Sequence, residues 1–350
     1  MATMKSVKTG APNTIDVVEA ERPVPGPKDV LVRIRACGIC GTDTFFVELG
    51  GTPYGPEGPT DSVVPLPLGH EPAGEIVEVG AQVDGLKAGD RVVVNPQGVP
   101  SGIIGCGGAH GGMSEYLLLE DAEVGRTVAV VPDTLPFDVA SLNEPMAVAL
   151  HCVNRSGATP SDKVLVFGAG PIGLGVTIWL KLRGVQHVVV ADVLPERLDT
   201  ALEIGADAVI DSAAEDVTAR LVELHGEAAN ALGQPRAGTD LYIDAAGVPA
   251  VFNSTVDAAK WGARLVMVAL QKKSADLDLG GMLRSELTLI SSQGYPTEIF
   301  EVTPELAAHQ ERFARLISHR VPFSDVTRAF DLARTPGAAE KVVVTFDDPE

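Results

Sequence analysis

The sequence predicts an α/β protein with two domains, a compact and mostly antiparallel β domain and a parallel sheet with crossover helices. Three observations support this prediction. The chain has 350 residues, which is enough for about two domains of ordinary size. The first half contains short β-branched runs between Gly and Pro clusters, and the second half alternates apolar runs with stretches of helical pattern. Parallel neighbours need such crossovers, because a tight turn cannot join them.

The β domain is predicted from five short runs rich in β-branched residues, each bounded by turn signals. These strands are expected at residues 29–37, 73–80, 90–94, 114–119 and 127–131. The Pro- and Gly-rich stretch 50–67 is expected to be a surface loop, and its position between two motifs suits the mouth of a site.

The parallel sheet is predicted from apolar runs that recur after about residue 160. Its strands are expected at residues 163–168, 187–192, 207–211, 240–247 and 263–270, and residues 287–292 complete a six-stranded sheet. Beyond residue 297 the pattern is helical again. A helix is expected over 304–316, a second one capped by Ser324, and a final strand over 341–346.

Charge and composition exclude several classes of protein. Lys and Arg number 27 against 47 Asp and Glu, and the net charge of −20 repels nucleic acid and anionic membrane surfaces. The chain lacks the run of ~18 apolar residues that a spanning helix needs. Its N-terminus lacks the apolar stretch of a signal peptide, so we expect a soluble, cytoplasmic protein. The 4 cysteines are better suspected as ligands or nucleophiles than as a disulfide framework.

A glycine-rich turn follows the first strand of the predicted parallel sheet, where residues 164–173 read VLVFGAGPIG. Gly168 permits a tight turn, Gly170 lets the backbone approach a pyrophosphate, and Gly173 lets the helix pack closely on the strand. Pro171 and Ile172 open the helix, whose N–H groups suit phosphates, and both join the glycines as cofactor-binding candidates. A purely structural turn is the alternative, because glycine turns after strands are common.

The next strand ends at Asp192, near the ~20-residue offset at which an acid accepts hydrogen bonds from the adenosine ribose. A carboxylate there repels the 2′-phosphate of NADP, so the sequence predicts NAD as the cofactor. Arg197 has two interpretations. It stacks on adenine or reaches a phosphate, or it is a solvated residue of the following helix.

Metal-ligating residue types occur in three motifs of the first half, CGICGTD, GHE and NEP. They bring forward Cys40, His70, Glu71 and Glu144 as candidate ligands. One thiolate, one imidazole and one carboxylate leave the fourth position of tetrahedral zinc open, as catalytic sites require. Taken singly, each residue also has an ordinary explanation: a small core cysteine, a buried histidine, or a glutamate at a helix N-terminus.

At this point the sequence resembles the zinc-dependent medium-chain dehydrogenases, and particularly their polyol branch of sorbitol and butanediol dehydrogenases. The matching stretches are CGICGTD, LGHEPAGEIVEVG, GDRVVV, NEPMAVALH, VLVFGAGPIGLG and ADVLPERL, in the order of the family and across nearly the whole chain. The resemblance implies a GroES-like β-barrel catalytic domain at 1–155 and 297–350. It also implies a doubly wound Rossmann domain for NAD at 156–296, with zinc between the two.

The resemblance assigns roles to individual residues. Cys40 and His70 match zinc ligands, Glu144 matches the carboxylate ligand of the polyol branch, and Thr42 matches the hydroxyl that takes the alcohol proton. Glu71 matches a glutamate near the zinc, which makes it a ligand or a group just outside the ligands. Adjacent side chains of an extended segment point to opposite faces, so His70 and Glu71 are not expected to bind one metal together comfortably.

The sequence departs from the family in two places. Relatives carry four close cysteines for a structural zinc, but between residues 95 and 112 this chain has Cys106 alone, so we expect one catalytic zinc per chain and no structural zinc. His110 is expected to be loop, and an improvised metal site of Cys106 and His110 is the disfavoured alternative. Relatives usually have a proton-relaying histidine where this chain has Phe45, so the later relay is expected to use water or another residue. Phe45 and Phe46 suggest an apolar mouth.

Two further cysteine and histidine assignments follow from their neighbours. Cys37 forms CxxC with Cys40, which suits redox chemistry, but packing is favoured because no second such pair exists. His151 lies two helical turns after Glu144, and core packing is its favoured role.

The resemblance implies a dehydrogenase that passes hydride from a secondary alcohol, diol or polyol to NAD. A threonine or glucose dehydrogenase of the same fold is the nearest alternative, and a non-catalytic nucleotide-binding relative is a second. The implied partner is a small-molecule alcohol. Relatives form dimers or tetramers through sheet edges, which makes residues 287–292 the candidate interface strand.

Overall fold

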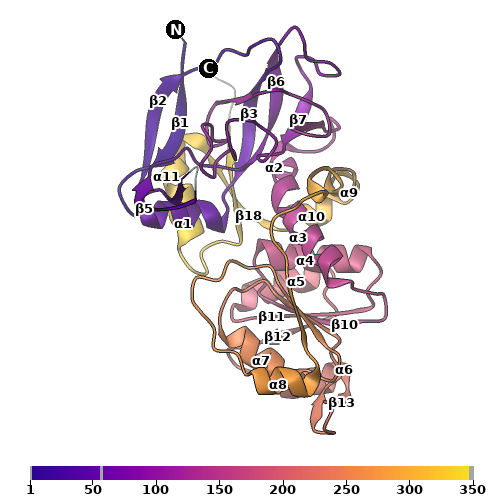
Figure 1. Ribbon diagram of the computed structural model, residues 1–350. Helices are drawn as coiled ribbons and strands as arrows, with labels where there is room; N and C mark the ends of the chain where they lie inside the picture. Colours follow the sequence, from indigo (N-terminus) through magenta and orange to yellow (C-terminus); the bar gives the residue numbers. More distant parts are fainter. Residues whose placement is uncertain (1, 56–57, 347–350) are drawn as a thin grey trace. The chain divides into compact units, whose positions relative to one another are not determined.

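The computed structural model describes residues 2–55 and 58–346, except for the side chains of 54–62 (Figure 1). Contacts divide it into two units. The first takes in residues 2–144, 299–310 and 317–346 of the described chain, and the second takes in Pro145–Glu298 and Glu311–Leu316. The domain boundaries expected at 155/156 and 296/297 stay a prediction.

The first unit is built on a mainly antiparallel sheet in the order β18-β19-β3-β6-β7-β9, with β8 also paired to β3. The five strands expected in the first half all form, within two residues of their expected bounds. The strands are β3 (Val30–Gly38), β6 (Glu71–Val79), β7 (Arg91–Val94), β8 (Tyr116–Leu119), β9 (Val128–Val130), β18 (Ile317–Pro322) and β19 (Lys341–Thr345). A separate hairpin of β1 (Thr3–Thr9) and β2 (Ile15–Glu21) was not anticipated.

The core of this unit lies along β3, which pairs with β19, β6 and β8 and is buried over most of its length. Cys37 is fully buried there, so the packing role expected for it is confirmed, and burial raises the pKa of its thiol far above the ordinary value. Helix α1 (Gly41–Leu49) follows the strand. Phe46 is 6% exposed and packs in the core, so its expected place at an apolar mouth was wrong.

Three local expectations were wrong. The stretch 50–67 is not simply a loop, because β4 (Thr52–Gly55) pairs antiparallel with β5 (Gly58–Val64). The expected helix over 304–316 is two helices, α9 (Val302–Ala308) and α10 (Gln310–Ala314). Ser324 caps no helix: it lies in the 3₁₀ turn η2 (Phe323–Asp325), which begins after Pro322 and moves the start of α11 (Val326–Arg334) beyond it.

The second unit contains a parallel sheet in the order β12-β11-β10-β15-β16-β17, so all six predicted strands are confirmed within the described residues. The strands are β10 (Lys163–Phe167), β11 (His187–Asp192), β12 (Ala208–Asp211), β15 (Leu241–Asp244), β16 (Arg264–Met267) and β17 (Thr288–Ser291). Between their polar ends, strands β10 and β11 are apolar and buried, as expected where helices cover both faces of a parallel sheet. The order reverses between β10 and β15, and ligands bind outside the carboxyl ends at such a point.

Helices connect these strands and provide the crossovers that the alternating pattern predicted. They are α4 (Pro171–Leu182), α5 (Pro195–Glu203), α6 (Val217–His225), α7 (Ala250–Ala258) and α8 (Leu279–Ser285), whereas α3 (Asn143–Ser156) leads into the first strand, β10. Two short strands, β13 (Glu227–Ala229) and β14 (Pro235–Ala237), form a hairpin after α6. None of the helices in the described ranges combines the length and apolar character needed to cross a bilayer.

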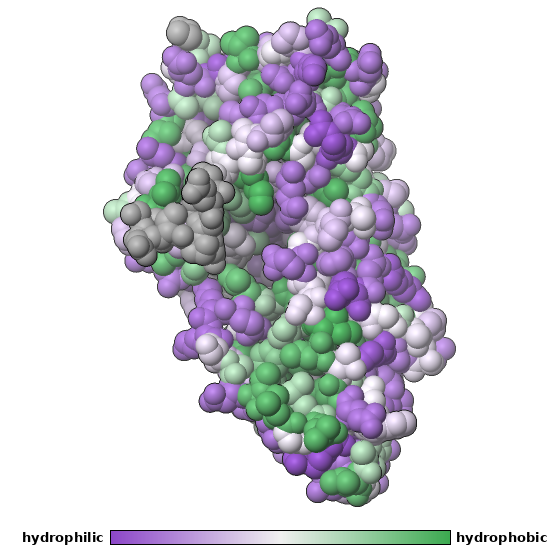
Figure 2. Space-filling model, in the orientation of Figure 1, coloured by the Kyte–Doolittle hydropathy of each residue, from purple (hydrophilic) through white to green (hydrophobic). Residues whose placement is uncertain are grey.

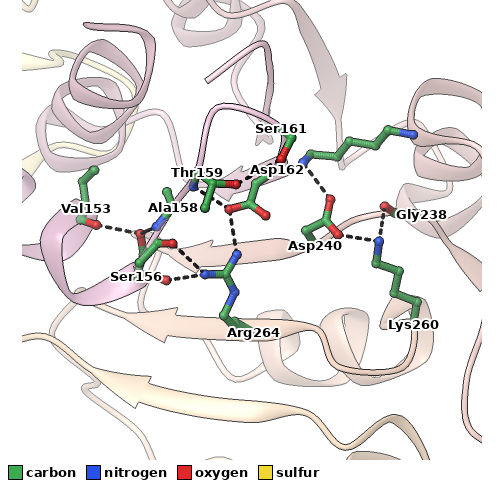
Figure 3. Close-up of polar contacts among 12 residues, drawn as sticks. Val153, Ser156, Ala158, Thr159, Ser161, Asp162, Gly238, Asp240, Lys260 and Arg264 are labelled. Atoms are coloured by element: carbon green, nitrogen blue, oxygen red, sulfur yellow. Dashed lines mark hydrogen bonds and ion pairs between the residues drawn. The ribbon is translucent and has the colours of Figure 1, made fainter. Parts of the chain in front are cut away.

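Ion pairs tie together the amino ends of the central strands (Figure 3). Arg264 at the start of β16 binds Asp162 at 2.8 Å, just before β10. Asp240, just before β15, accepts the Lys163 backbone N–H at 2.9 Å and binds Lys260 at 2.5 Å. These charged side chains therefore have partners within the sheet region itself.

Candidate metal centre and dinucleotide site

Three candidate ligands of the first unit come together: the ligand atoms of Cys40, His70 and Glu71 lie within 4.8 Å of one another. Strand pairing explains the meeting. Gly38 at the end of β3 lies opposite Glu71 at the start of β6, so the residues just beyond each strand end lie close together. A thiolate, an imidazole and a carboxylate at this spacing are a donor set that suits Zn²⁺.

His70 and Glu71 share this centre because His70 precedes β6 rather than lying in it. Gly69 turns the chain with φ +89°, and a Cβ there would lie 2.6 Å from the Met113 backbone nitrogen. His70 itself lies in a bend, so the alternation of side chains along an extended strand begins only with Glu71. The expectation that the two side chains diverge was therefore wrong.

Asp43 holds the histidine in place, a role that the sequence reasoning missed. Its carboxylate lies 3.5 Å from His70 Nδ1 and accepts the backbone N–H groups of Cys40 at 2.9 Å and Gly69 at 3.0 Å. Burial opposes its charge, but His70 and these two donors hold the pKa of Asp43 below its usual value. With Nδ1 turned to a carboxylate, Nε2 is the nitrogen left for a metal. The available signal was an acid three residues after Cys40.

Lys341 is a second residue that sequence reasoning missed. Only 2% exposed, it forms an ion pair with Glu71 and donates to the Ile39 carbonyl at 3.0 Å. Burial opposes its charge, yet Glu71, Cys40 and Glu144 raise the pKa of Lys341 above its usual value. A lysine at the start of an apolar strand was the only hint in the sequence. Its ammonium offsets the negative charge that gathers at the centre.

The other candidates surround the three central residues. Glu144, 8% exposed in the first turn of α3, lies outside the Cys40–His70–Glu71 group, although its charge acts on Lys341. Thr42 Oγ1 lies 3.7 Å from Cys40 Sγ.

Cys106 approaches the centre from the loop that follows β7. Its Sγ lies 3.4 Å from His70 Nδ1. The backbone carbonyl of His110 accepts the Gly105 N–H at 2.8 Å, which suits its expected role as loop. Cys106 thus lies on the Nδ1 side of the imidazole, together with Asp43.

His151 belongs to the second unit and is not simply a packing residue. Its Nδ1 lies 2.9 Å from Glu298 Oε1, and Asn154 donates to the same oxygen at 2.8 Å. Burial opposes the charge of Glu298, but these partners lower its pKa to about 2.

The three glycines of the turn after β10 have different surroundings. Gly168 has φ +95°, and a Cβ on Gly173 would lie 1.8 Å from the Gly168 carbonyl oxygen. A Cβ on Gly170 would meet nothing within 4 Å. The space at Gly170 is therefore open, as the approach of a pyrophosphate requires, and α4 begins immediately beyond it with Pro171 and Ile172.

Asp192 ends β11 and contacts the glycine turn. One carboxylate oxygen accepts the Ala169 N–H at 2.6 Å, and the other accepts those of Val193 at 2.7 Å and Leu194 at 3.0 Å. Arg197 lies in the first turn of α5, half-buried. The predicted cofactor residues thus gather at the carboxyl ends of neighbouring strands.

Comparison with known proteins identifies the family. The family model for the alcohol dehydrogenase GroES-like domain matches residues 26–132, and that for zinc-binding dehydrogenases matches residues 171–308. The (R,R)-butanediol dehydrogenase of Bacillus subtilis is 33% identical over 308 residues, which cover 83% of this chain and 85% of that protein. The chain belongs to the zinc-binding dehydrogenase family. It is therefore an oxidoreductase.

Other relatives of this zinc-binding dehydrogenase support the same family assignment. Human sorbitol dehydrogenase is 30% identical over 339 residues, 93% of this chain and 91% of that one. An alcohol dehydrogenase structure from Escherichia coli CFT073, complexed with NADH, has 26% identity and a TM-score of 0.80 over 99% of this chain and 100% of that chain. A zinc-binding dehydrogenase structure from Sinorhizobium meliloti 1021, bound to NADP, has 28% identity and the same TM-score and coverage. The polyol branch and the two-part fold are both confirmed.

Proposed function

We propose that this dehydrogenase oxidises a secondary alcohol, diol or polyol, with one catalytic zinc ion and NAD. The observation that carries the proposal is the convergence of Cys40, His70 and Glu71 within 4.8 Å. When bound, zinc supplies Lewis acidity that lowers the pKa of a substrate hydroxyl, and NAD accepts the hydride. The names of the butanediol and sorbitol dehydrogenase relatives support this substrate class.

The chain's own residues bind, orient and move a proton. We assign Cys40 and His70 as zinc ligands, with the carboxylates of Glu71 and Glu144 as the candidates for the third position. Lys341 bears directly on that choice, because its ammonium is paired with Glu71. The ion pair lowers the tendency of the Glu71 carboxylate to bind a second cation. This favours Glu144 as the permanent third zinc ligand and Glu71 as a ligand that exchanges with water.

Thr42 is proposed as the residue that takes the substrate proton. Its hydroxyl lies beside the Cys40 sulfur, at 3.7 Å, and a hydroxyl both accepts and donates hydrogen bonds. Phe45 occupies the relay position where relatives have histidine and cannot pass a proton on. If Phe45→His leaves the pH–rate profile unchanged, the idea that water replaces a histidine relay is wrong.

The cofactor preference is proposed from Asp192. Its carboxylate lies at the end of β11, where a 2′-phosphate would meet a negative charge. The relative bound to NADP shows that the family also accepts the phosphorylated cofactor, so the preference has to be measured. We expect a lower KM for NAD than for NADP, and the reverse order would overturn this assignment.

The deciding experiment is a substrate panel with metal analysis. We expect about one zinc per chain, and zinc-dependent NADH formation with 2,3-butanediol, sorbitol or xylitol. Activity with threonine or glucose alone would move the enzyme to the alternative substrate class of the same fold. Two zinc ions per chain would reject the single-site prediction. Binding of NAD without turnover of any substrate would favour the non-catalytic relative, which Phe45 alone suggests.

A further inference from the structure

The loop after β16 carries a side-chain amide whose orientation is determined by its neighbour. Gln271 Nε2 donates to Asp244 Oδ2 at 2.7 Å. The other oxygen of Asp244 accepts the backbone N–H groups of Ala246 at 3.0 Å and Gly247 at 2.9 Å. Asp244 thus acts as an acceptor toward each of these groups. The amide nitrogen of Gln271 therefore faces Asp244, and its oxygen points the other way.

That amide oxygen is an unsatisfied acceptor. Gln271 Oε1 is buried and accepts no hydrogen bond from any residue in 2–55 or 58–346. Buried polar atoms in native proteins are nearly always paired, and an unpaired one is unfavourable. Because Asp244 prevents the amide from turning over, the oxygen requires a donor from outside this part of the chain.

The position of this oxygen indicates which ligand supplies the donor. Asp244 ends β15, directly beside β10 and its glycine turn. A Cβ on Gly168 would lie 2.9 Å from the Ala245 carbonyl carbon, and a Cβ on Gly247 would lie 2.7 Å from the Leu270 carbonyl oxygen. Residues 245–247 are thus packed between the glycine turn and the loop that carries Gln271.

The two sides of the turn receive different halves of a dinucleotide. Asp192, which suits the adenosine ribose, ends β11 on one side of β10, whereas β15 and β16 lie on the other side. A dinucleotide whose pyrophosphate lies at the glycine turn places its second nucleoside over β15 and β16. Gln271 therefore lies on the nicotinamide half.

We propose that Gln271 is a cofactor-binding residue, whose Oε1 accepts a hydrogen bond from the carboxamide amino group of the nicotinamide. Asp244 is its positioning residue, because it holds the amide nitrogen away. This inference deepens the proposed use of NAD and rests on it. An acceptor fixed in this way binds the edge of the pyridine ring that carries the amide. It therefore determines the orientation of the ring.

The test compares three ligands on two proteins. Dissociation constants are measured by calorimetry for NADH, for ADP-ribose, which lacks the pyridine, and for reduced 3-acetylpyridine adenine dinucleotide, which has a methyl ketone in place of the amide. Gln271→Met is expected to weaken NADH about tenfold, the effect of about one lost hydrogen bond. The other two ligands are expected to bind it as they bind the wild type, because neither offers the amino group.

Matched variants guard against distortion of the loop. Gln186→Met makes the same change at an exposed glutamine just before β11, at the amino ends of the strands, and is expected to bind all three ligands like the wild type. If Gln271→Met fails to fold, Gln271→Asn withdraws the oxygen by one methylene and is expected to show the same selective loss.

The possible outcomes separate this inference from the proposed function. Equal loss for all three ligands overturns the inference, since it indicates a ribose contact or a deformed loop. Unchanged NADH binding in both Gln271 variants overturns it too, while the use of NAD stands. A wild-type protein that binds neither NADH nor ADP-ribose contradicts the proposed function itself.

Discussion

At the scale of single residues, buried charges are the most consequential feature of the first unit. Lys341 and Glu71 are 2% and 1% exposed, and neither ion is stable in such an environment without a partner of opposite charge. The pair is therefore a condition for folding as well as a constraint on metal binding. The sequence around either residue does not show that they pair. Lys341 also lies 302 positions from Ile39, whose carbonyl accepts its second hydrogen bond.

We expect Lys341→Met to destabilise the metal-free protein by about 3–5 kcal/mol, because it leaves the Glu71 carboxylate buried and unpaired. Zinc is expected to restore part of this loss by supplying positive charge at the same place. Urea unfolding with a chelator and then with zinc measures both effects. Lys181→Met is the control: it removes a more exposed pair with Asp207, at 2.8 Å, and is expected to cost about 1 kcal/mol or less. An equal cost for the two variants would contradict the prediction.

His225 makes the second unit sensitive to acid. It is 1% exposed and hydrogen-bonds Thr239 at 2.7 Å and His187 at 3.1 Å. Burial, and then the neighbouring His187, lower the pKa of His225 from 6.5 to about 4. The unfolded chain therefore takes up a proton first as the pH falls, and stability that is complete above pH 6.5 is lost progressively toward pH 4.

The expected loss is about 3 kcal/mol across that window. Urea unfolding at a series of pH values measures it, and His225→Gln is expected to flatten the dependence because glutamine does not titrate. Folding lowers the pKa of Glu298 from 4.5 to about 2, so its own contribution to stability is lost mainly below pH 4.5 and adds little to the slope between pH 6.5 and 4.5. If His225→Gln retains the full slope, another group is responsible.

At the scale of an element, the glycines of the turn between β10 and α4 are predicted to serve different purposes, some in folding and one in cofactor binding. The spacing of its glycines predicted three roles, and the environments of Gly168, Gly170 and Gly173 differ as those roles require. Two of the three are constrained by the protein itself. Gly170 alone among them borders open space.

Gly173→Ala is expected to lower the melting temperature by several degrees, because its Cβ would lie 1.8 Å from the Gly168 carbonyl oxygen. Gly170→Ala is expected to leave melting nearly unchanged and to weaken NADH about tenfold or more, since the methyl occupies the phosphate space. Thermal melting and NADH titration of both variants provide the comparison. A Gly170→Ala protein with unaltered affinity would place the pyrophosphate elsewhere.

At the scale of the whole molecule, the exposed edge of the parallel sheet favours self-association. Strand β17 ends the sheet, and the helix before it leaves apolar side chains in solvent: Leu279 is 69% exposed and Leu283 is 77% exposed, with Leu289 of β17 at 36%. Figure 2 shows hydrophobic residues gathering over α7 and α8. An apolar edge strand left open invites pairing or aggregation. We propose that a second copy covers this edge.

Light scattering is expected to show a dimer or a tetramer, and Leu283→Lys with Leu289→Lys is expected to shift it to a monomer. Val24→Lys, at a residue that is 84% exposed in the first unit, is the control and is expected to leave the assembly intact. A monomeric wild type would refute the proposed interface.

Much of the architecture was predictable because it depends on short-range patterns. Alternation and apolar runs located the strands of both units, and the glycine turn and its acid, which the structure brings together, are the residues proposed for the cofactor. The wrong predictions came from segments whose local composition is compatible with two different structures. The Pro- and Gly-rich stretch 50–67 reads as a loop, yet part of it pairs as β4 and β5. Ser324 is a good capping residue by type, but the 3₁₀ turn after Pro322 displaced the start of the helix.

The sequence alone established the family, the Rossmann half with its glycine turn and Asp192, and the residue types that suit a catalytic metal. Only the tertiary structure showed that the chain bends at His70, before β6 begins, and that His70 and Glu71 face one centre. It also showed that Asp43, Cys106 and Lys341 lie around that centre, and that Gln271 has an acceptor for which the described residues supply no donor. The physical reason is distance along the chain: periodicity reports neighbours within a few residues, whereas buried charges and hydrogen bonds are completed by groups that only folding brings together.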